Sequence, residues 1–374
     1  MQKKKFFSID YHATIAEDAR NILKHIYQEN VEFEDWCTSA HYFIFNKERK
    51  KLDVDIFPFM TKEKIREFHQ KYDAYLSQFD GFIVTHIIGL TLLFEKYDKP
   101  IIIINSCRYN LPFTDVYSLK SPNLEMWEEL NDCLRRLQKK DLLVAISNNK
   151  GDQEYLRLGT GIESAWIPSL CKYTGEENQQ EGIFYIFRKN NIEITTSEKL
   201  QYVDDFLIKK GIIHKVVKKF NEKVLGVRTE SYTWKDLYKT LGMVHIPYEI
   251  STMSILEHYA ANVPLFLPSK NYLKELINSN AIHFQSSYDP DSHPENLDIA
   301  LNHDKWVNFW VERADYYDEE NMKYITYFNS SDEIHDVLNE VNSQEISEKM
   351  KEWNIERSKK IIDCWSSLTS KIFD

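Results

Sequence analysis

The first half of the chain alternates short apolar runs with longer stretches in which apolar residues recur every three to four positions. The apolar runs have the length of buried strands, at residues 5–9, 80–86, 100–105 and 142–146. The periodic stretches predict helices at 13–26, 61–78, 90–97 and 125–139. Strands and helices in alternation indicate a parallel sheet covered by helices on both faces. Three further apolar runs, at 31–33, 42–45 and 54–57, are possible additional strands.

The second half repeats this alternation after a polar segment. Residues 173–182 carry turn formers and no apolar periodicity, so they predict a linker. Beyond the linker we expect strands at 183–187, 243–246 and 322–328, and helices at 234–241, 253–261, 272–277, 305–316, 331–338 and 343–372. The pattern therefore predicts a first domain at 1–172, a second domain at 183–345 and a C-terminal helix at 346–374.

Polar residues follow the predicted strands of the first half. Asp10 and His12 come directly after the first strand, His86 closes the strand at 80–86, and Arg108 lies in the loop after the next one. Open α/β sheets bind ligands outside the carboxyl ends of their strands, so these residues are candidates for a functional site. The alternatives are structural: Asp10 caps the following helix, His12 only packs, and His86 is an ordinary strand-end histidine.

A second candidate site lies where the predicted strand at 243–246 leads through a short loop into a helix. Ser251, Thr252 and Ser254 are typical of helix starts, where a hydroxyl accepts a hydrogen bond from a backbone N–H group. Together with Met253 they define a helix N-terminus, and such a terminus binds phosphate through clustered N–H groups and the positive end of the helix dipole.

Two carboxylates bracket this loop, and two residues are expected to end the helix behind it. Glu249 precedes the loop, and Glu257 lies one to two turns into the helix. A carboxylate beside a phosphate site can accept hydrogen bonds from sugar hydroxyls. Asn262 can close the helix, and Pro264 forbids its continuation.

The composition excludes several classes of function. The chain has 374 residues, 43% of them hydrophobic, enough for two domains. Its formal net charge of −11 and its short basic clusters disfavour nucleic-acid binding and leave at most weak contact with a membrane surface. No stretch has the length of a membrane-spanning helix. The five cysteines are scattered, which predicts reduced thiols, no structural zinc site and a cytoplasmic location.

The stretch from Glu249 to Pro264 resembles the donor-site signature of retaining glycosyltransferases of the GT-B fold, especially family 4. Seven residues separate Glu249 from Glu257, as in that signature, and the Ala-Ala-Asn-Val-Pro sequence at 260–264 also fits it. Residues 82–106 resemble a second family stretch, in which a strand ends in a histidine, here His86. The family usually has glycines between the two Glu, and this chain has Ile250, Ser251 and Thr252 there.

The resemblance implies two doubly wound, Rossmann-like α/β domains that face each other across a cleft, with the C-terminal helix crossing back to the first domain. It implies transfer of a sugar from a UDP- or GDP-sugar to a hydroxyl of a glycan or glycoconjugate acceptor, with retention at the anomeric carbon. Arg188 resembles the arginine that clamps the donor diphosphate in the family, and Lys189 or Lys199 could supply the second cation. No metal and no cofactor besides the donor are therefore expected. The alternative for Arg188 and Lys189 is a surface pair at a strand end.

The resemblance also implies roles for the candidate residues. Glu257 would bind the ribose and Glu249 the donor sugar, and the diphosphate would be bound by Ser251, Thr252, Met253, Ser254, Arg188 and Lys189. The acceptor would be held by Asp10, His12, His86 and Arg108. Two other functions stay open: a sugar-nucleotide epimerase of the same fold, and a catalytically inactive binding protein, for which the missing loop glycines are the motive.

Overall fold

The structure is a computed structural model, and it describes residues 3–54, 56, 60–113, 123–181, 184–187, 233–247, 249–279, 303–330 and 333–373. The chain forms two compact units. The N-terminal unit contains the described residues up to Tyr173 and those from Lys359 onward, and the C-terminal unit contains the described residues between Thr174 and Ser358. The domain limits 1–172, 183–345 and 346–374 stay predictions.

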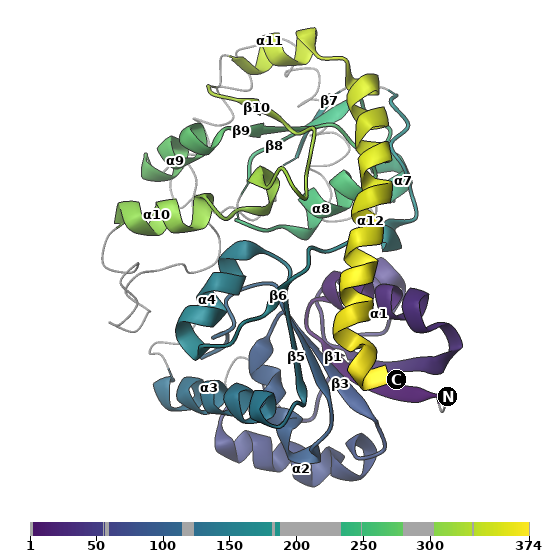
Figure 1. Cartoon of the computed structure of the whole chain (residues 1–374), viewed down its shortest axis with the longest axis vertical. Coiled ribbons are helices and arrows are strands. Elements are labelled where there is room, and N and C mark those ends of the chain that lie inside the picture. Colours follow the sequence, from purple (N-terminus) through teal and green to yellow (C-terminus); the bar gives the residue numbers. More distant parts are fainter. Residues whose placement is uncertain are drawn as a thin grey trace. The chain divides into compact units, whose positions relative to one another are not determined.

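The N-terminal unit is built around a six-stranded parallel sheet with the strand order β2-β1-β3-β4-β5-β6 (Figure 1). Its strands are β1 (Lys4–Asp10), β2 (Val31–Cys37), β3 (Gly81–Thr85), β4 (Ile101–Asn105), β5 (Leu143–Ser147) and β6 (Ala165–Trp166). Its α-helices are α1 (Ala13–Tyr27), α2 (Lys62–Leu76), α3 (Leu124–Lys139) and α4 (Lys150–Thr160).

Two adjacent residues of β1 show that both faces of this sheet are covered. Phe7 packs against Tyr75 of α2 and against Phe79, which follows that helix. Side chains alternate along a strand, so Phe6 points to the opposite face, where its ring lies 5.0 Å from that of Phe373. Phe373 ends the long helix α12 (Ser343–Phe373), drawn in yellow in Figure 1. Tyr27 of α1 stacks on the same ring, so α1 and the last turns of α12 share this face.

The C-terminal unit contains a four-stranded parallel sheet with the strand order β10-β9-β8-β7. Its strands are β7 (Phe184–Phe187), β8 (Gly242–His245), β9 (Leu265–Pro268) and β10 (Thr326–Phe328). The helices seen in its described part are α7 (Trp234–Leu237), α8 (Met253–Ala260), α9 (Lys270–Asn278), α10 (His303–Val311), α11 (Glu333–Glu340) and the first half of α12.

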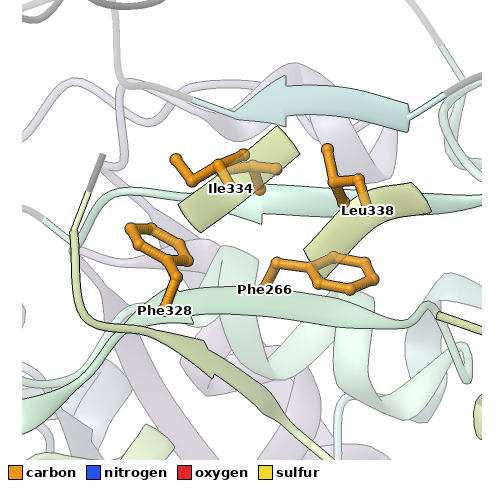
Figure 2. Close-up of a cluster of buried hydrophobic side chains, with 5 residues drawn as sticks. Phe266, Phe328, Ile334 and Leu338 are labelled. Atoms are coloured by element: carbon orange, nitrogen blue, oxygen red, sulfur yellow. The ribbon is translucent and has the colours of Figure 1, made fainter. Parts of the chain in front are cut away.

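A buried apolar cluster holds α11 on this second sheet. Val244, Phe266 and Phe328 come from three neighbouring strands, and Ile334 and Leu338 come from α11. The two α11 residues are four positions apart and so lie on one face of the helix. Figure 2 shows both aliphatic side chains beside the phenylalanine rings. The predicted fold class is confirmed: two α/β units are built on parallel sheets, and the last turns of the C-terminal helix belong to the N-terminal unit.

Three local predictions differ from the structure. The run 42–45, a possible strand, is a 3₁₀ helix (Tyr42–Phe45) that ends at Asn46, whose φ is +52°. The stretch 90–97, predicted as an α-helix, forms two 3₁₀ segments, Ile88–Leu93 and Glu95–Tyr97. All six residues of the first segment are buried, so it has no polar face of the kind that a surface α-helix presents. At 54–57, a possible strand, the described residues Val54 and Ile56 belong to no strand, and Asp55 and Phe57 lie outside the described residues. No helix in the described part of the chain is long and apolar enough to cross a membrane.

Candidate functional site

The strand order of the N-terminal sheet changes direction between β1 and β3. From β1 the chain passes through α1 to β2 on one side, and it returns to β3 on the other side of β1. Loops that diverge in this way at the carboxyl edge form the place where open α/β sheets bind ligands. Tyr11 and His12 follow β1 at this point, and His86 follows β3.

The structure brings these rings together. The His12 and His86 ring centroids are 4.9 Å apart, and the Tyr11 ring is nearly parallel to that of His86 at 6.3 Å. The Ser106 hydroxyl, which follows β4, lies 3.4 Å from His86 Nδ1, and the Thr14 hydroxyl lies 3.0 Å from His12 Nδ1. Both histidines are half-buried, so a ligand can reach them. His12 and His86 were predicted, whereas Tyr11 and Ser106 were not singled out, although their strand-end positions carry the same signal.

His86 has an unusual backbone conformation. Its φ is +62°, in the left-handed region that few residues other than glycine adopt. The Cys107 thiol donates a hydrogen bond to the His86 carbonyl oxygen at 2.9 Å and helps to hold this conformation. Such conformations cluster at functional sites, because the surrounding structure must enforce them.

Asp10 lies below this edge. Its side chain is fully buried, forms an ion pair with Arg20 of α1 at 2.7 Å and accepts a hydrogen bond from the Ser8 hydroxyl at 2.7 Å. Burial raises the pKa of the Asp10 carboxyl, while the charges of Arg20 and Lys47 oppose that rise. Asp10 does not cap α1 either, since the N-cap residue is His12. This environment favours a structural role for Asp10 over the catalytic role that the sequence predicted.

Arg108 is also buried, with 2% of its surface exposed. Burial raises the pKa of the Asp152 carboxyl in α4, and the positive charge of Arg108 lowers it. Asn149 donates a hydrogen bond to the same carboxylate at 2.7 Å. Arg108 thus balances a buried carboxylate, a role that its place in a loop after a strand did not suggest.

In the C-terminal unit, the loop between β8 and α8 is held by a segment far along the chain. The Tyr316 hydroxyl donates to the Glu249 carbonyl oxygen at 3.1 Å, and the Asp315 N–H donates to the Ile250 carbonyl oxygen at 3.1 Å. The Ser251 hydroxyl donates to the Asp315 carboxylate. Sequence reasoning missed Asp315 and Tyr316, because the pattern there predicted only a continuation of the helix at 305–316.

The N-terminus of α8 offers hydrogen-bond donors. Thr252 is the N-cap, and its hydroxyl accepts the Ile255 N–H at 3.4 Å. Among the residues that the structure describes, the N–H groups of Met253 and Ser254 have no hydrogen-bond partner. The Ser254 hydroxyl is buried and likewise has none. The first turn of α8 therefore holds two backbone donors, one hydroxyl and the positive end of a helix dipole.

Glu249 and Glu257 are both half-buried beside this terminus. Glu257 lies three positions after Ser254, so the two side chains share one face of α8. At the other end of the helix, Asn262 has a φ of +62°, and the Val263 N–H donates to the His258 carbonyl oxygen at 3.0 Å. This pattern is a Schellman C-cap and confirms that Asn262 closes the helix.

The predicted diphosphate-binding cations Arg188 and Lys189 lie outside the described residues. The strand before them is described: Phe187, the last residue of β7, pairs with His245, the last residue of β8. The ends of β7 and β8 therefore lie side by side at the edge where the loop to α8 begins. Within the described ranges, no group of three or more His, Cys, Asp or Glu side chains could hold a metal ion.

A second pair of histidines lies in the interior of this unit. His245 and His258 are fully buried, with ring centroids 6.3 Å apart, and the Tyr238 ring lies 5.8 Å from that of His258. Burial lowers the pKa of His258 to about 3 and holds the pKa of His245 well below its usual value. Both imidazoles are therefore neutral near pH 7, and neither offers a charge to a phosphate.

No protein-family model matches this chain, and no curated protein matches it. Among solved structures, the chain is similar to the glycotransferase of kitacinnamycin, with a TM-score of 0.43, 8% identity, and coverage of 98% of this chain and 100% of that chain. It is also similar to a spinosyn rhamnosyltransferase complexed with thymidine diphosphate (TM-score 0.42, 9% identity, 95% and 96% covered). A UDP-N-acetylglucosamine 2-epimerase is a third similar structure (TM-score 0.35, 11% identity, 87% and 92% covered). These values are too low to transfer an activity to this chain.

Proposed function

We propose that this protein is a glycosyltransferase that moves a sugar from a nucleotide-sugar donor to an acceptor hydroxyl. The observation that carries the proposal is the N-terminus of α8, where the N–H groups of Met253 and Ser254 and the buried Ser254 hydroxyl have no hydrogen-bond partner among the described residues. A buried polar group without a partner is costly, so a ligand rich in acceptor oxygens fits this place. A diphosphate is such a ligand.

The missing glycines do not count against this site, because the side chains that replace them are buried or engaged in hydrogen bonds within the protein. Ile250 is buried, with 1% of its surface exposed. The Ser251 hydroxyl is bound to Asp315, and the Thr252 hydroxyl caps α8. The backbone of the loop can therefore face a diphosphate even without glycines.

The donor site needs a cation. The Asp315 carboxylate lies against Ser251, and a negative charge there opposes the binding of a diphosphate. We assign the compensating charge to Arg188 and Lys189, which follow β7 in the sequence. The last residue of β7, Phe187, pairs with the last residue of β8, His245. Two protein cations remove the need for a metal ion, so transfer is expected to proceed in EDTA.

The two carboxylates would bind the rest of the donor. Glu257 shares the face of α8 with Ser254 and would accept hydrogen bonds from the ribose hydroxyls. Glu249 would contact the transferred sugar. As the resemblance to family 4 implies, the sugar keeps its anomeric configuration: the bond from the anomeric carbon to the phosphate oxygen breaks, and the acceptor oxygen bonds to the same face of that carbon.

His12 and His86 would act on the acceptor. A neutral imidazole within hydrogen-bond reach can take the proton from the acceptor hydroxyl as its oxygen bonds to the anomeric carbon. The His12–His86 pair at the point where the strand order reverses supports this assignment. The donor diphosphate leaves with its charge stabilised by the N–H groups of α8 and by Arg188.

The test is to incubate the full chain with UDP-, GDP- and dTDP-sugars and to follow nucleotide release and products by mass spectrometry. We expect nucleotide release that rises with an added saccharide acceptor, persists in EDTA and weakens in Ser254→Ala. Alanine favours the helix more than serine does, so this variant keeps α8. An epimerised sugar formed without an acceptor would identify an epimerase instead. Absence of both nucleotide binding and sugar transfer would overturn the proposal.

A further inference from the structure

A polar pocket of about 410 Å³ lies in the C-terminal unit at the C-terminal end of α8. It is lined by the segment 177–180, by Asn262 and by side chains of the first turns of α12. The proposed donor site lies at the other end of α8, about 12 Å away along a helix of eight residues. The pocket is therefore separate from the proposed donor site.

The walls of this pocket are held by hydrogen bonds. Asn178 donates from its backbone N–H to the Ala261 carbonyl oxygen at 2.8 Å, and its side-chain amide donates to the Thr240 carbonyl oxygen at 2.8 Å. The Ser347 hydroxyl of α12 donates to the Asn262 carbonyl oxygen at 2.8 Å. These bonds join three separate segments into one preformed cavity.

Two side-chain amides of the pocket have hydrogen-bonding capacity left. Asn262 is 5% exposed, and its Oδ1 accepts a hydrogen bond from Asn354 at 2.8 Å, but its amide nitrogen has no partner among the described residues. The Gln179 side chain also lines the pocket without a hydrogen bond within the described part of the chain. These two amides can donate hydrogen bonds to an occupant of the pocket that carries acceptor oxygens.

The charges of the pocket indicate what such an occupant is. Glu177 pairs with Lys351 at 2.6 Å, so these two charges offset each other. Among the described residues, Glu348 has no partner besides the Gln344 amide, which donates a hydrogen bond to it at 3.0 Å, so Glu348 gives the pocket a negative balance. A phosphate or a nucleotide is disfavoured there. The pocket offers amide groups that donate hydrogen bonds and carboxylates that accept them. A ligand hydroxyl fits both, because it can accept one hydrogen bond and donate another.

We infer that this pocket binds a neutral, hydroxyl-rich ligand, a saccharide, at a site separate from the donor site. The inference does not depend on the proposed transfer reaction, because it rests on the pocket's own amides and carboxylates. The ligand's hydroxyl oxygens would accept from the amides of Asn262 and Gln179, and its hydroxyl protons would be donated to Glu348.

The test is nuclear magnetic resonance of the full chain, observing the side-chain amide signals of Gln179 and Asn262. Glucose, galactose, mannose and N-acetylglucosamine are titrated singly, and inorganic phosphate is the negative probe. We expect saturable shifts of both amides with at least one saccharide and none with phosphate. Gln179→Leu, which removes the amide and fills its space, should abolish the saccharide shift at Asn262. Asn262→Gly should abolish the shift at Gln179, and it keeps the left-handed backbone that the C-cap requires.

The matched control is Glu352→Gln, which alters an exposed carboxylate of α12 that does not line the pocket. It should leave the saccharide shifts unchanged, whereas Glu348→Gln should weaken them. Shifts that stay linear with every saccharide would overturn the inference, as would a saturable shift that persists in both Gln179→Leu and Asn262→Gly. A saturable shift with phosphate would overturn the assignment of a neutral ligand.

Discussion

The molecule contains two pairs of neighbouring histidines in opposite surroundings. His12 and His86 in the N-terminal unit have ring centroids 4.9 Å apart and are half-buried at strand ends. His245 and His258 in the C-terminal unit are 6.3 Å apart and fully buried. Both pairs consist of histidines with neighbouring rings, so the property that distinguishes them is burial. The half-buried pair can be reached by a ligand, whereas the buried pair is held neutral as part of a core.

The same contrast occurs between neighbours in the sequence. Asp10 and His12 are two positions apart, yet Asp10 is fully buried in an ion pair and His12 is half-buried beside His86. Glu257 and His258 are adjacent on α8, yet one is half-buried and the other is fully buried. Substitutions at the buried members should therefore change stability, and substitutions at the half-buried members should change binding or rate.

The largest effect is expected for Asp10→Ala. It leaves Arg20 buried without its closest partner, and breaking a buried ion pair costs about 3–5 kcal/mol of the free energy of unfolding. Urea denaturation of the full chain measures this loss. The control is Glu125→Ala, which breaks the exposed Lys62–Glu125 pair of almost equal length, 2.8 Å, and should cost about 0–1 kcal/mol. Equal losses in the two variants would contradict the structural role of Asp10.

The next effect is on rate. His12→Ala should slow sugar transfer about 100- to 1,000-fold, because it removes the base proposed for the acceptor hydroxyl. The melting temperature should stay close to that of the unchanged chain, since the side chain is half-buried. Steady-state kinetics together with thermal unfolding checks both statements. His25→Ala, at an exposed position of α1, should leave the rate unchanged, and an equal loss of rate in that variant would remove the case for His12.

The sequence predicted the features of the fold and of the candidate sites that depend on interactions between residues close together in the chain. Local rules located Thr252 as a helix start and Asn262 as a helix end, because both depend on a few adjacent residues. The strand-end rule located His12 and His86. Sequence could not show that Asp10 turns toward Arg20, or that Arg108 balances Asp152, because burial depends on how the elements pack around each residue. The bonds of Asp315 and Tyr316 to the loop before α8 span more than sixty positions and leave no local pattern.

A smaller effect is expected at the donor site. Glu257→Ala should weaken nucleotide binding by about 1.5–3 kcal/mol, the value of a hydrogen bond to a charged group. Glu249→Ala should mainly slow transfer, because Glu249 is assigned to the sugar. Titration calorimetry with UDP and GDP measures the first effect, and kinetics measures the second. Glu275→Ala, at an exposed position of α9, is the control. Unchanged affinity in Glu257→Ala would show that the ribose assignment is wrong.

The smallest expected effect is a change in the free energy of unfolding with each unit of pH. It comes from the buried histidines His245 and His258. Burial lowers the pKa of His258 from its usual value of 6.5 to about 3 in the folded state. Between these values the unfolded chain binds a proton that the folded chain does not, so the free energy of unfolding falls as the pH falls. The expected slope below pH 6.5 is about 1.4 kcal/mol per pH unit for each buried histidine.

His258→Leu should remove that share of the slope. His258→Phe keeps a ring beside Tyr238, and it should lose the same share, because a packing change alters stability without altering proton uptake. Hydrogen exchange of peptides from β8 and α8, measured from pH 7.5 to about 5.5, follows the C-terminal unit above the range where carboxylates titrate. A slope unchanged in both variants would show that His258 takes up a proton in the folded state, and the contrast between the two histidine pairs would not hold.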